Sequence, residues 1–279
     1  MKQSFFKSPI MWKDSAVFAF ALLAGIESTM SIAAISIYDI ISKWWWRFFF
    51  VIALYIVLTI LTLIVKYIRT KNEITIYVRG IKVTIKQGDI FEAKGWKLIP
   101  FNTYLDANKT MVDDIFINKN SLNGKLILEH LDDNGIEELN VAIATDDNSL
   151  LKKYLDRKTK RIKYPLGRIK IFRDYMLLAF IDFDEQNEAH TTHAEYENTL
   201  RAMWKEISRT YANKPIFLPF IGTGITRFDD MPEKNYMELL RCIICTLRTS
   251  NVYINQPITI LLTQDALSKI NLYELKGVQ

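Results

Sequence analysis

Cysteine and histidine are scarce in this chain, which has two cysteines and three histidines among its 279 residues. Two cysteines exclude a disulfide framework, and Cys242 and Cys245 lie three positions apart in a predicted apolar helix. We therefore expect buried thiols in a reducing compartment. His190 and His193 have the spacing of two ligands on a helical turn. Because no cysteine or further histidine accompanies them in the sequence, we predict no metal site.

Signatures of catalysis are also missing. The sequence has no Gly-x-Ser-x-Gly elbow, no Walker lysine and no protease signature. Paired carboxylates occur at Asp113-Asp114 and Asp132-Asp133, but both pairs lie in polar stretches that are typical of solvated loops. We therefore predict no catalytic residues and no cofactor, and the pattern favours a binding protein over an enzyme.

Positive charge is concentrated near the N-terminus. Residues 1–70 hold seven Lys/Arg against three Asp/Glu, a net charge of +4, whereas residues 71–279 hold 29 against 28, a net of +1. A nucleic acid is therefore not the predicted partner. The predicted helix 149–161 has a basic face, which we interpret as solvated; contact with anionic lipid is the alternative.

Two long apolar runs are the most distinctive feature of the N-terminal quarter. Residues 48–65 contain no charge, and at 1.5 Å per residue such a helix nearly spans a hydrocarbon core of roughly 30 Å. Tryptophans at 44–46 precede it and basic residues follow it, as expected at the two interfaces. This pattern predicts a transmembrane helix at about 46–67.

A second span is predicted at about 16–37, although polar residues interrupt it. Small residues recur every fourth position from Ala21 through Gly25 and Thr29 to Ala33, a stripe that lets membrane helices approach closely. Glu27 is costly in lipid, so we expect it to face a partner. A cleaved signal peptide is the alternative, but its length, Glu27 and the second span argue against it. Residues 1–70 thus form a predicted transmembrane hairpin, with Gly25, Glu27 and Thr29 as candidate assembly residues.

Orientation follows from the loop charges. Lysines 2, 7 and 13 precede the hairpin, and Lys66, Arg69 and Lys71 follow it. The positive-inside rule then places both termini and residues 74–279 in the cytoplasm.

Residues 74–279 form the second predicted domain. Strands are predicted at 74–78, 81–85, 96–101, 139–145, 168–173, 175–183, 215–220 and 258–262, and helices at 121–131, 149–161, 196–211, 236–247 and 265–275. The alternation in the second half predicts an α/β fold with a mixed, mostly buried sheet.

A glycine loop joins the predicted strand 215–220 to the helix that begins near Tyr236. Gly222-Thr223-Gly224 allows a tight turn, and backbone N–H groups in such a turn cradle phosphate. An ordinary tight turn is the alternative. Nearby, Arg227 is a candidate charge partner. At other strand ends Asp89 could accept a hydrogen bond from an exocyclic amine, or be a simple turn residue, and Asn102 could bond a ribose hydroxyl.

These segments resemble macro domains, the ADP-ribose-binding α/β/α modules. The resemblance rests on Gln87-Gly-Asp-Ile90, on the strand that ends at Asn102, and on the Pro219 to Ile225 loop. Tyr164-Pro-Leu-Gly-Arg-Ile-Lys-Ile-Phe-Arg-Asp-Tyr175 and Ile221-Gly-Thr-Gly-Ile-Thr-Arg-Phe228 are more specifically similar to the ThsA macro-domain branch of type II Thoeris anti-phage defence. In that branch a pair of N-terminal membrane helices precedes the macro domain.

The resemblance implies a macro-domain-like α/β/α sandwich that follows the two-helix transmembrane hairpin. It also implies a bacterial inner-membrane effector whose signal, a histidine–ADP-ribose conjugate, is made by a partner TIR-domain protein. Signal binding would make the chain oligomerise and disrupt the lipid bilayer in abortive infection. The ligand-binding residues implied are Asp89, Ile90, Asn102, Ser121, Leu122, Gly222, Thr223, Gly224, Ile225, Thr226 and Arg227.

One departure from the macro-domain pattern bears on activity. Hydrolytic members carry an Asn-Ala-Ala-Asn segment, where this sequence has Phe101-Asn-Thr-Tyr104. We therefore expect a reader of the nucleotide, and keep as the alternative a membrane-tethered ADP-ribosyl hydrolase that uses Asp113 or Asp114.

Overall fold

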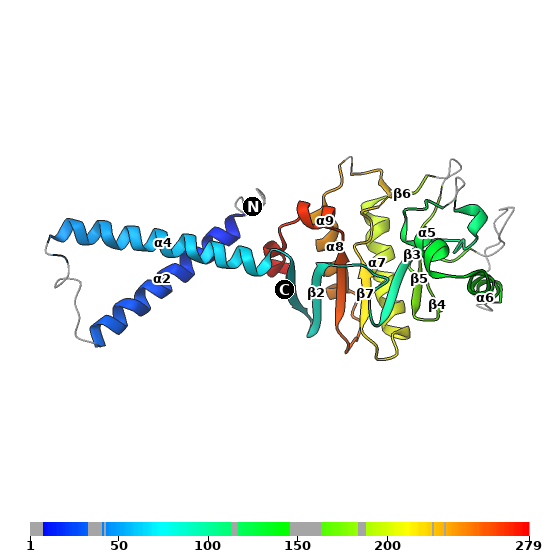
Figure 1. Ribbon diagram of the computed structural model, residues 1–279, viewed down its shortest axis with the longest axis horizontal. Helices are drawn as coiled ribbons and strands as arrows, with labels where there is room; N and C mark the ends of the chain where they lie inside the picture. The colour runs from blue at the N-terminus through cyan, green and yellow to red at the C-terminus, as the bar shows by residue number, and fades with distance from the viewer. Residues whose placement is uncertain are drawn as a thin grey trace. The chain divides into compact units, whose positions relative to one another are not determined.

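The computed structural model describes residues 8–32, 41, 43–112, 117–145, 163–183, 188–224, 226–231 and 233–278. The chain divides into two compact units (Figure 1). One consists of Met1–Ile74 together with Ser268–Gly277, and the other of Thr75–Leu267 with Val278–Gln279.

Two long helices make up most of the first unit. α2 covers Pro9–Ile32 and α4 covers Trp44–Thr70, and both are long and apolar enough to cross a bilayer. The second helix agrees with the predicted span. The first begins at Pro9, seven positions before the predicted Ala16, because a proline is tolerated in the first turn and the polar residues that follow extend the helix beyond its apolar part. The predicted residues after Ile32 lie outside the described part.

The two helices pack through a short set of buried side chains, most of which are small or polar. On α2 the buried residues Met11, Ser15 and Ala19 recur every fourth position and therefore share one face. On α4 the buried positions include Thr59, Thr62 and Leu63. The Thr62 hydroxyl donates to the carbonyl of Ser15 at 3.3 Å, and that of Tyr55 donates to the carbonyl of Ala16, also at 3.3 Å.

The predicted assembly residues lie elsewhere on α2. Gly25, Glu27 and Thr29 are all exposed, so they belong to a surface that the partner helix of the hairpin does not cover. The Thr29 hydroxyl donates to the carbonyl of Gly25 at 2.8 Å, which satisfies it within the helix.

A seven-stranded mixed sheet forms the centre of the second unit, in the order β1-β2-β9-β7-β3-β5-β4. The strands are β1 Glu73–Val78, β2 Ile81–Gln87, β3 Trp96–Asn102, β4 Ile169–Phe172, β5 Tyr175–Ile181, β7 Ile216–Pro219 and β9 Ile258–Leu262. The pairs β2–β9, β9–β7, β7–β3 and β3–β5 are parallel, whereas β4 pairs antiparallel with β5. A small second sheet pairs β6 His190–Thr191 with β8 Arg227–Phe228. The predicted mixed, buried sheet is confirmed.

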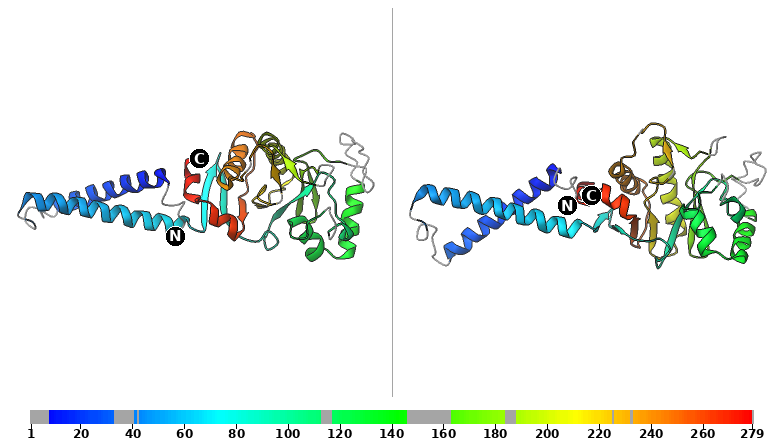
Figure 2. Two further views of the ribbon diagram at one scale, coloured as in Figure 1. Left: turned by 90° about the horizontal axis from the view of Figure 1, so that it is seen from above. Right: turned by 45° about the horizontal axis from the view of Figure 1, so that its top comes forward.

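Helices cover both faces of the large sheet (Figure 2). Alternate residues of β5 divide the core: Leu177 and Ala179 join the cluster that contains α5 Leu122–Lys125, η2 Leu126–His130 and α6 Asp133–Ala144. On the other face Phe180 meets Tyr196 of α7 His193–Thr210 with ring centroids 6.0 Å apart. α8 Tyr236–Thr249 packs beside α7, where Trp204 donates to the Thr246 hydroxyl at 3.1 Å. The result is the predicted α/β/α sandwich.

The predicted strand at 139–145 is wrong, because residues 139–144 belong to α6 and Thr145 is its C-cap. Asp132 caps that helix by accepting from the N–H of Gly135 at 2.8 Å. Ile136, Leu139 and Ile143 are then buried at helical spacing, whereas Val141 is 55% exposed. The run is apolar enough for a strand, but its upstream cap and its three-to-four-residue period make it a helix.

The remaining predicted elements agree with the observed ones to within a few residues, are divided in two, or lie outside the described residues. Helix 149–161 and the pair Asp113-Asp114 belong to the last group. Near the C-terminus the single predicted helix is divided into α9 Gln264–Lys269 and the 3-10 helix η4 Leu272–Val278. Of the two cysteines, Cys242 is buried as predicted and Cys245 is half-buried.

Candidate ligand-binding site

A cavity of about 670 Å³ opens where the parallel strands of the sheet end. Its lining includes residues at or just after the carboxyl ends of β2, β3, β5, β7 and β9. Residues of the segment that leads into α5 complete the lining. Ligands of α/β proteins bind at this edge of the sheet, and the volume suits a nucleotide-sized molecule. The site is therefore built by topology, from six segments of the chain.

The glycine loop forms one wall of the cavity. Gly222 has φ +87°, a conformation that side chains disfavour, and a Cβ there would lie 3.1 Å from the Tyr196 ring. Tyr196 supports the loop from α7 by donating its hydroxyl to the carbonyl of Ile221 at 3.0 Å. Complete burial holds the pKa of Tyr196 well above its usual range, so the phenol keeps the proton that it donates.

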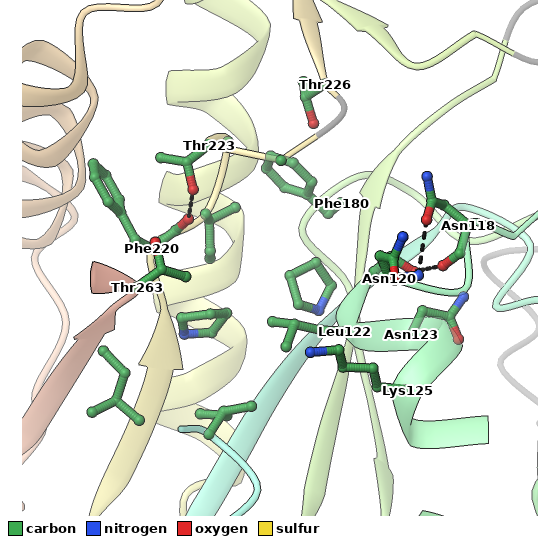
Figure 3. A pocket seen from close by; sticks show the side chains of 18 of the residues that line it. Asn118, Asn120, Leu122, Asn123, Lys125, Phe180, Phe220, Thr223, Thr226 and Thr263 are labelled. Atoms are coloured by element: carbon green, nitrogen blue, oxygen red, sulfur yellow. Dashed lines mark hydrogen bonds between the residues drawn. The ribbon is translucent and has the colours of Figure 1, made fainter. Parts of the chain in front are cut away.

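Two further side chains fix the loop. The Thr223 hydroxyl donates to the carbonyl of Phe220 at 2.8 Å (Figure 3). Lys234 donates its amino group to the carbonyl of Gly224, and burial lowers the pKa of that lysine. Gly224 and Thr226 also line the cavity, whereas the predicted Ile225 lies outside the described residues. The carbonyls of Phe220, Ile221 and Gly224 are therefore hydrogen-bonded within the protein. A glycine loop of this kind can bind an anion through its backbone N–H groups.

Asp89 and Ile90 lie together in the cavity wall after β2, as the sequence placed them. One oxygen of Asp89 accepts from the N–H of Phe91 at 2.9 Å, which orients the exposed carboxylate. Ile90 is buried against the core. Phe91 stacks on His130 with ring centroids 3.9 Å apart, so the loop that carries Asp89 is held against η2.

Asn102 lines the cavity, but its amide is used largely within its own loop. Its Oδ1 accepts from the N–H groups of Tyr104 and Asp106, at 3.2 and 3.1 Å, and its Nδ2 donates to the Asp106 carboxylate at 2.6 Å. Asn102 is 4% exposed. Asn102 therefore stabilises the turn after β3. Its predicted bond to a ribose hydroxyl stays a prediction.

The opposite wall comes from the segment that precedes and begins α5. Ser121 caps α5 by accepting from the N–H of Gly124 at 3.0 Å, and both Ser121 and Leu122 line the cavity. Lys125 extends its amino group toward the cavity in the same view (Figure 3). A lysine on this wall and a glycine loop on the other are groups that suit a bound diphosphate.

Arg227 does not line this cavity. It lies at a smaller neighbouring hollow with His190, Asp229 and Lys234, and its guanidinium is paired with the Glu188 carboxylate. His190 lies in the same group, 2.6 Å from Asp229 and 3.2 Å from Glu188. The structure thus separates the two histidines of the sequence motif, since His193 turns into α7.

Several lining residues were not singled out in the sequence. They are Asn118, Asn120, Asn123, Lys125, Phe180, Phe183, Thr263 and Gln264. Thr263 and Gln264 directly follow β9, so the rule that ligands bind at strand ends was a usable signal for them. The asparagines had no such signal, because their position depends on how the segment before α5 folds back over the sheet.

Comparisons with known proteins agree with this architecture. A family model described as the macro domain of Thoeris protein ThsA matches residues 83–263. Thoeris protein ThsA of Bacillus amyloliquefaciens (strain Y2) is 36% identical over 228 residues, which are 78% of this chain and 75% of that protein.

Solved macrodomains from Oceanobacillus iheyensis are similar at lower identity. The one with ADP is 13% identical, covers 74% of this chain and 96% of its own, and has a TM-score of 0.49. A variant with ADPR is 14% identical, with the same coverage and a TM-score of 0.46.

The class that the sheet, its layers and the matched segment define is a macro domain, here preceded by two apolar helices. More narrowly, the chain belongs to the Thoeris ThsA family.

Proposed function

We propose that this chain is a membrane-anchored effector of anti-phage defence whose macro domain binds an ADP-ribose-derived signal. The signal is a histidine–ADP-ribose conjugate made by a partner TIR-domain protein. Binding makes the chains oligomerise through their hairpins in the bacterial inner membrane, which they disrupt, so that the cell stops growing. The macro domain and both termini lie in the cytoplasm.

The observation that carries this proposal is the construction of the cavity at the strand ends. A glycine loop with Gly222 at positive φ faces a wall with Lys125, and the exposed Asp89 carboxylate lines the same cavity, where we propose that it accepts a hydrogen bond from a base amine. Together these groups match the diphosphate and the adenine of ADP-ribose. The cavity volume of about 670 Å³ leaves room for a molecule of this size.

We propose a reader of the nucleotide and not an enzyme. The segment at 101–104 departs from that of hydrolytic macro domains. Both the Oδ1 and the Nδ2 of Asn102 form hydrogen bonds within its own turn. An amide that is held in this way supports the shape of the wall and does not position water for attack on a glycosidic carbon.

Calorimetry on the full-length chain in lipid nanodiscs tests the proposal. We expect ADP-ribose and its histidine conjugate to bind at one site per chain, and Asp89→Ala to weaken binding by about tenfold or more, as loss of a charge-assisted hydrogen bond does. Glu92→Ala is the matched control, because Glu92 is exposed three positions away and does not line the cavity.

Two outcomes would count against the proposal. Failure of every ADP-ribose compound to bind the unmodified chain would refute the signal class. Release of free ADP-ribose from an ADP-ribosylated substrate during the same incubation, detected by mass spectrometry, would instead favour the membrane-tethered hydrolase.

A further inference from the structure

Three side chains with metal-binding chemistry converge between α7 and α8. His193 and Glu197 lie one turn apart on α7, and Cys242 projects from α8. Their ligand atoms all lie within 4.8 Å of one another. His193 and Glu197 are half-buried and Cys242 is buried, so the group lies in the seam between the helices and not on an open surface.

The donor set suits zinc better than other common ions. Zn²⁺ takes imidazole nitrogen, carboxylate oxygen and thiolate sulfur, whereas Mg²⁺ and Ca²⁺ prefer oxygen alone. A histidine and an acid at i and i+4 reach one ion from the same helical face. Arg201 lies 3.5 Å from the Glu197 carboxylate, and an ion bound by Glu197 would compete with this pair.

We propose that His193, Glu197 and Cys242 form a zinc site that fastens α7 to α8 behind the glycine loop. The same first turn of α7 holds the loop around Asp230, whose carboxylate accepts from the N–H of His193 at 3.0 and 2.9 Å. Tyr196, which supports the glycine loop, lies between the two ligands of α7. The ion would therefore stiffen the helix pair on which that wall of the cavity rests.

Zinc content of the full-length chain in detergent tests the site. After incubation with Zn²⁺ and removal of free metal, we expect about one zinc per chain, and Co²⁺ in its place should show a thiolate-to-cobalt charge-transfer band. Cys242→Ser and Glu197→Gln should retain at least tenfold less metal. Cys245→Ser is the matched control, since it removes the other thiol of the same helix.

No retained zinc in the unmodified chain, or equal retention in Cys242→Ser and Cys245→Ser, would overturn the site. Circular dichroism of each variant identifies a loss of metal that follows from misfolding, and Glu197→Gln, at a half-buried position, keeps the test valid if Cys242→Ser does not fold.

A separate observation concerns the C-terminal segment of the first unit. Tyr273 of η4 is 2% exposed and packs with Met11 of α2 and Leu63 of α4. Its hydroxyl donates to the Asp14 carboxylate at 2.7 Å. The Lys66 amino group lies 5.5 Å from the centroid of the same ring, so one tyrosine contacts both helices of the hairpin near the ends that carry Pro9 and Thr70.

This tyrosine is close in sequence to the ligand cavity. Gln264, which lines the cavity, precedes Tyr273 by nine positions, and α9 occupies most of that interval. Thr263 begins α9 by accepting from the N–H of Ala266 at 3.2 Å, so the helix starts at the cavity wall. α9 thus joins the residues that line the cavity to η4 directly along the chain.

We infer that η4 couples the ligand cavity to the hairpin, with Tyr273 as its positioning residue. This inference rests on the proposed function, since it needs a ligand that occupies the cavity and a membrane response. It gives the hairpin a second connection to the macro domain, besides the direct passage from α4 into β1.

Leakage of dye from liposomes that contain the full-length chain tests the coupling. With the histidine–ADP-ribose conjugate added, we expect Tyr273→Ala and Asp14→Ala to bind it as the unmodified chain does. Both variants should need at least tenfold more conjugate than the unmodified chain for the same dye leakage. Leakage without any ligand would support the coupling too, because the contact then restrains the hairpin. Tyr253→Ala, at a residue that is 78% exposed, is the matched control.

The failures of the two ideas are distinguishable. If the unmodified chain neither binds the conjugate nor causes dye leakage, the proposed function fails. If it does both and Tyr273→Ala and Asp14→Ala respond as it does, only the coupling fails. Tyr273→Phe, which keeps the ring and loses the bond to Asp14, serves if the alanine variant does not fold.

Discussion

At the scale of single residues, the site depends on a close approach between Gly222 and Tyr196. The glycine has no Cβ, so the loop passes over the aromatic ring while the phenol holds the carbonyl of the preceding residue. Both contacts would be strained by any side chain at position 222. The glycine is thus required by backbone conformation and by packing together.

We expect Gly222→Ala to lower the free energy of unfolding by about 1–2 kcal/mol, because an L-residue is forced to positive φ against the ring. Urea unfolding of the full-length chain in detergent, followed by circular dichroism, measures it. Gly224→Ala is the control, since a Cβ there meets nothing within 4 Å, and its effect should stay within about 0.5 kcal/mol. Equal losses in both variants would contradict the argument.

At the scale of elements, α6 shows how a cap decides between helix and strand. Residues 139–145 are apolar enough for either, but Asp132 satisfies an N–H group of the first turn and so favours the helix. Ile136, Leu139 and Ile143 then cover one face of the sheet beside the ligand cavity. The cap therefore stabilises a layer on which the segment before α5 rests.

Removal of this cap should be measurable. Asp132→Ala is expected to cost about 1 kcal/mol of unfolding free energy, while Asp132→Asn should retain most of it because an asparagine oxygen also caps. Asp133→Ala is the matched control: Asp133 is exposed and pairs at 2.6 Å with Lys109, a surface contact of little value. An Asp133→Ala loss as large as that of Asp132→Ala, in the same urea titration, would show that the cap is not the cause.

At the scale of the whole molecule, a ligand-binding domain is joined to a hairpin by a very short connection. α4 ends at Thr70 and β1 begins at Glu73. Within the hairpin, Met11, Ser15 and Ala19 are covered, whereas Gly25, Glu27 and Thr29 are exposed. An acid exposed on an apolar helix is costly in lipid unless another chain covers it, which supports assembly of several hairpins.

Glu27→Ala separates an assembling hairpin from a plain anchor. We expect the variant to reach the membrane fraction like the unmodified chain but to lose growth arrest when the signal is present, as counted by plating. Ser28→Ala is the control, because its exposed hydroxyl bonds only the carbonyl of Ala24 at 2.9 Å among the described residues. Full growth arrest by Glu27→Ala would mean that the hairpin serves only to hold the domain at the bilayer.

The sequence alone determined those features that depend on neighbours along the chain. An uncharged run predicts α4, alternation and turn residues predict β1 and β2, and the spacing of apolar residues predicts α7 and α8, because periodicity and propensity are local properties. It also located Asp89, Ile90, Ser121, Leu122, Gly222, Thr223, Gly224 and Thr226, all of which line the cavity.

Tertiary structure decided what depends on residues that are far apart. Only the order of the strands brings their ends to one edge, so that Thr263 and Gln264 share one cavity with Asp89, and leaves Arg227 in the neighbouring hollow. Only the packing of α7 on α8 brings Cys242 to His193, and only the fold of the C-terminus brings Tyr273 to Asp14. Such contacts follow from chain topology and burial, which no local pattern of residues encodes.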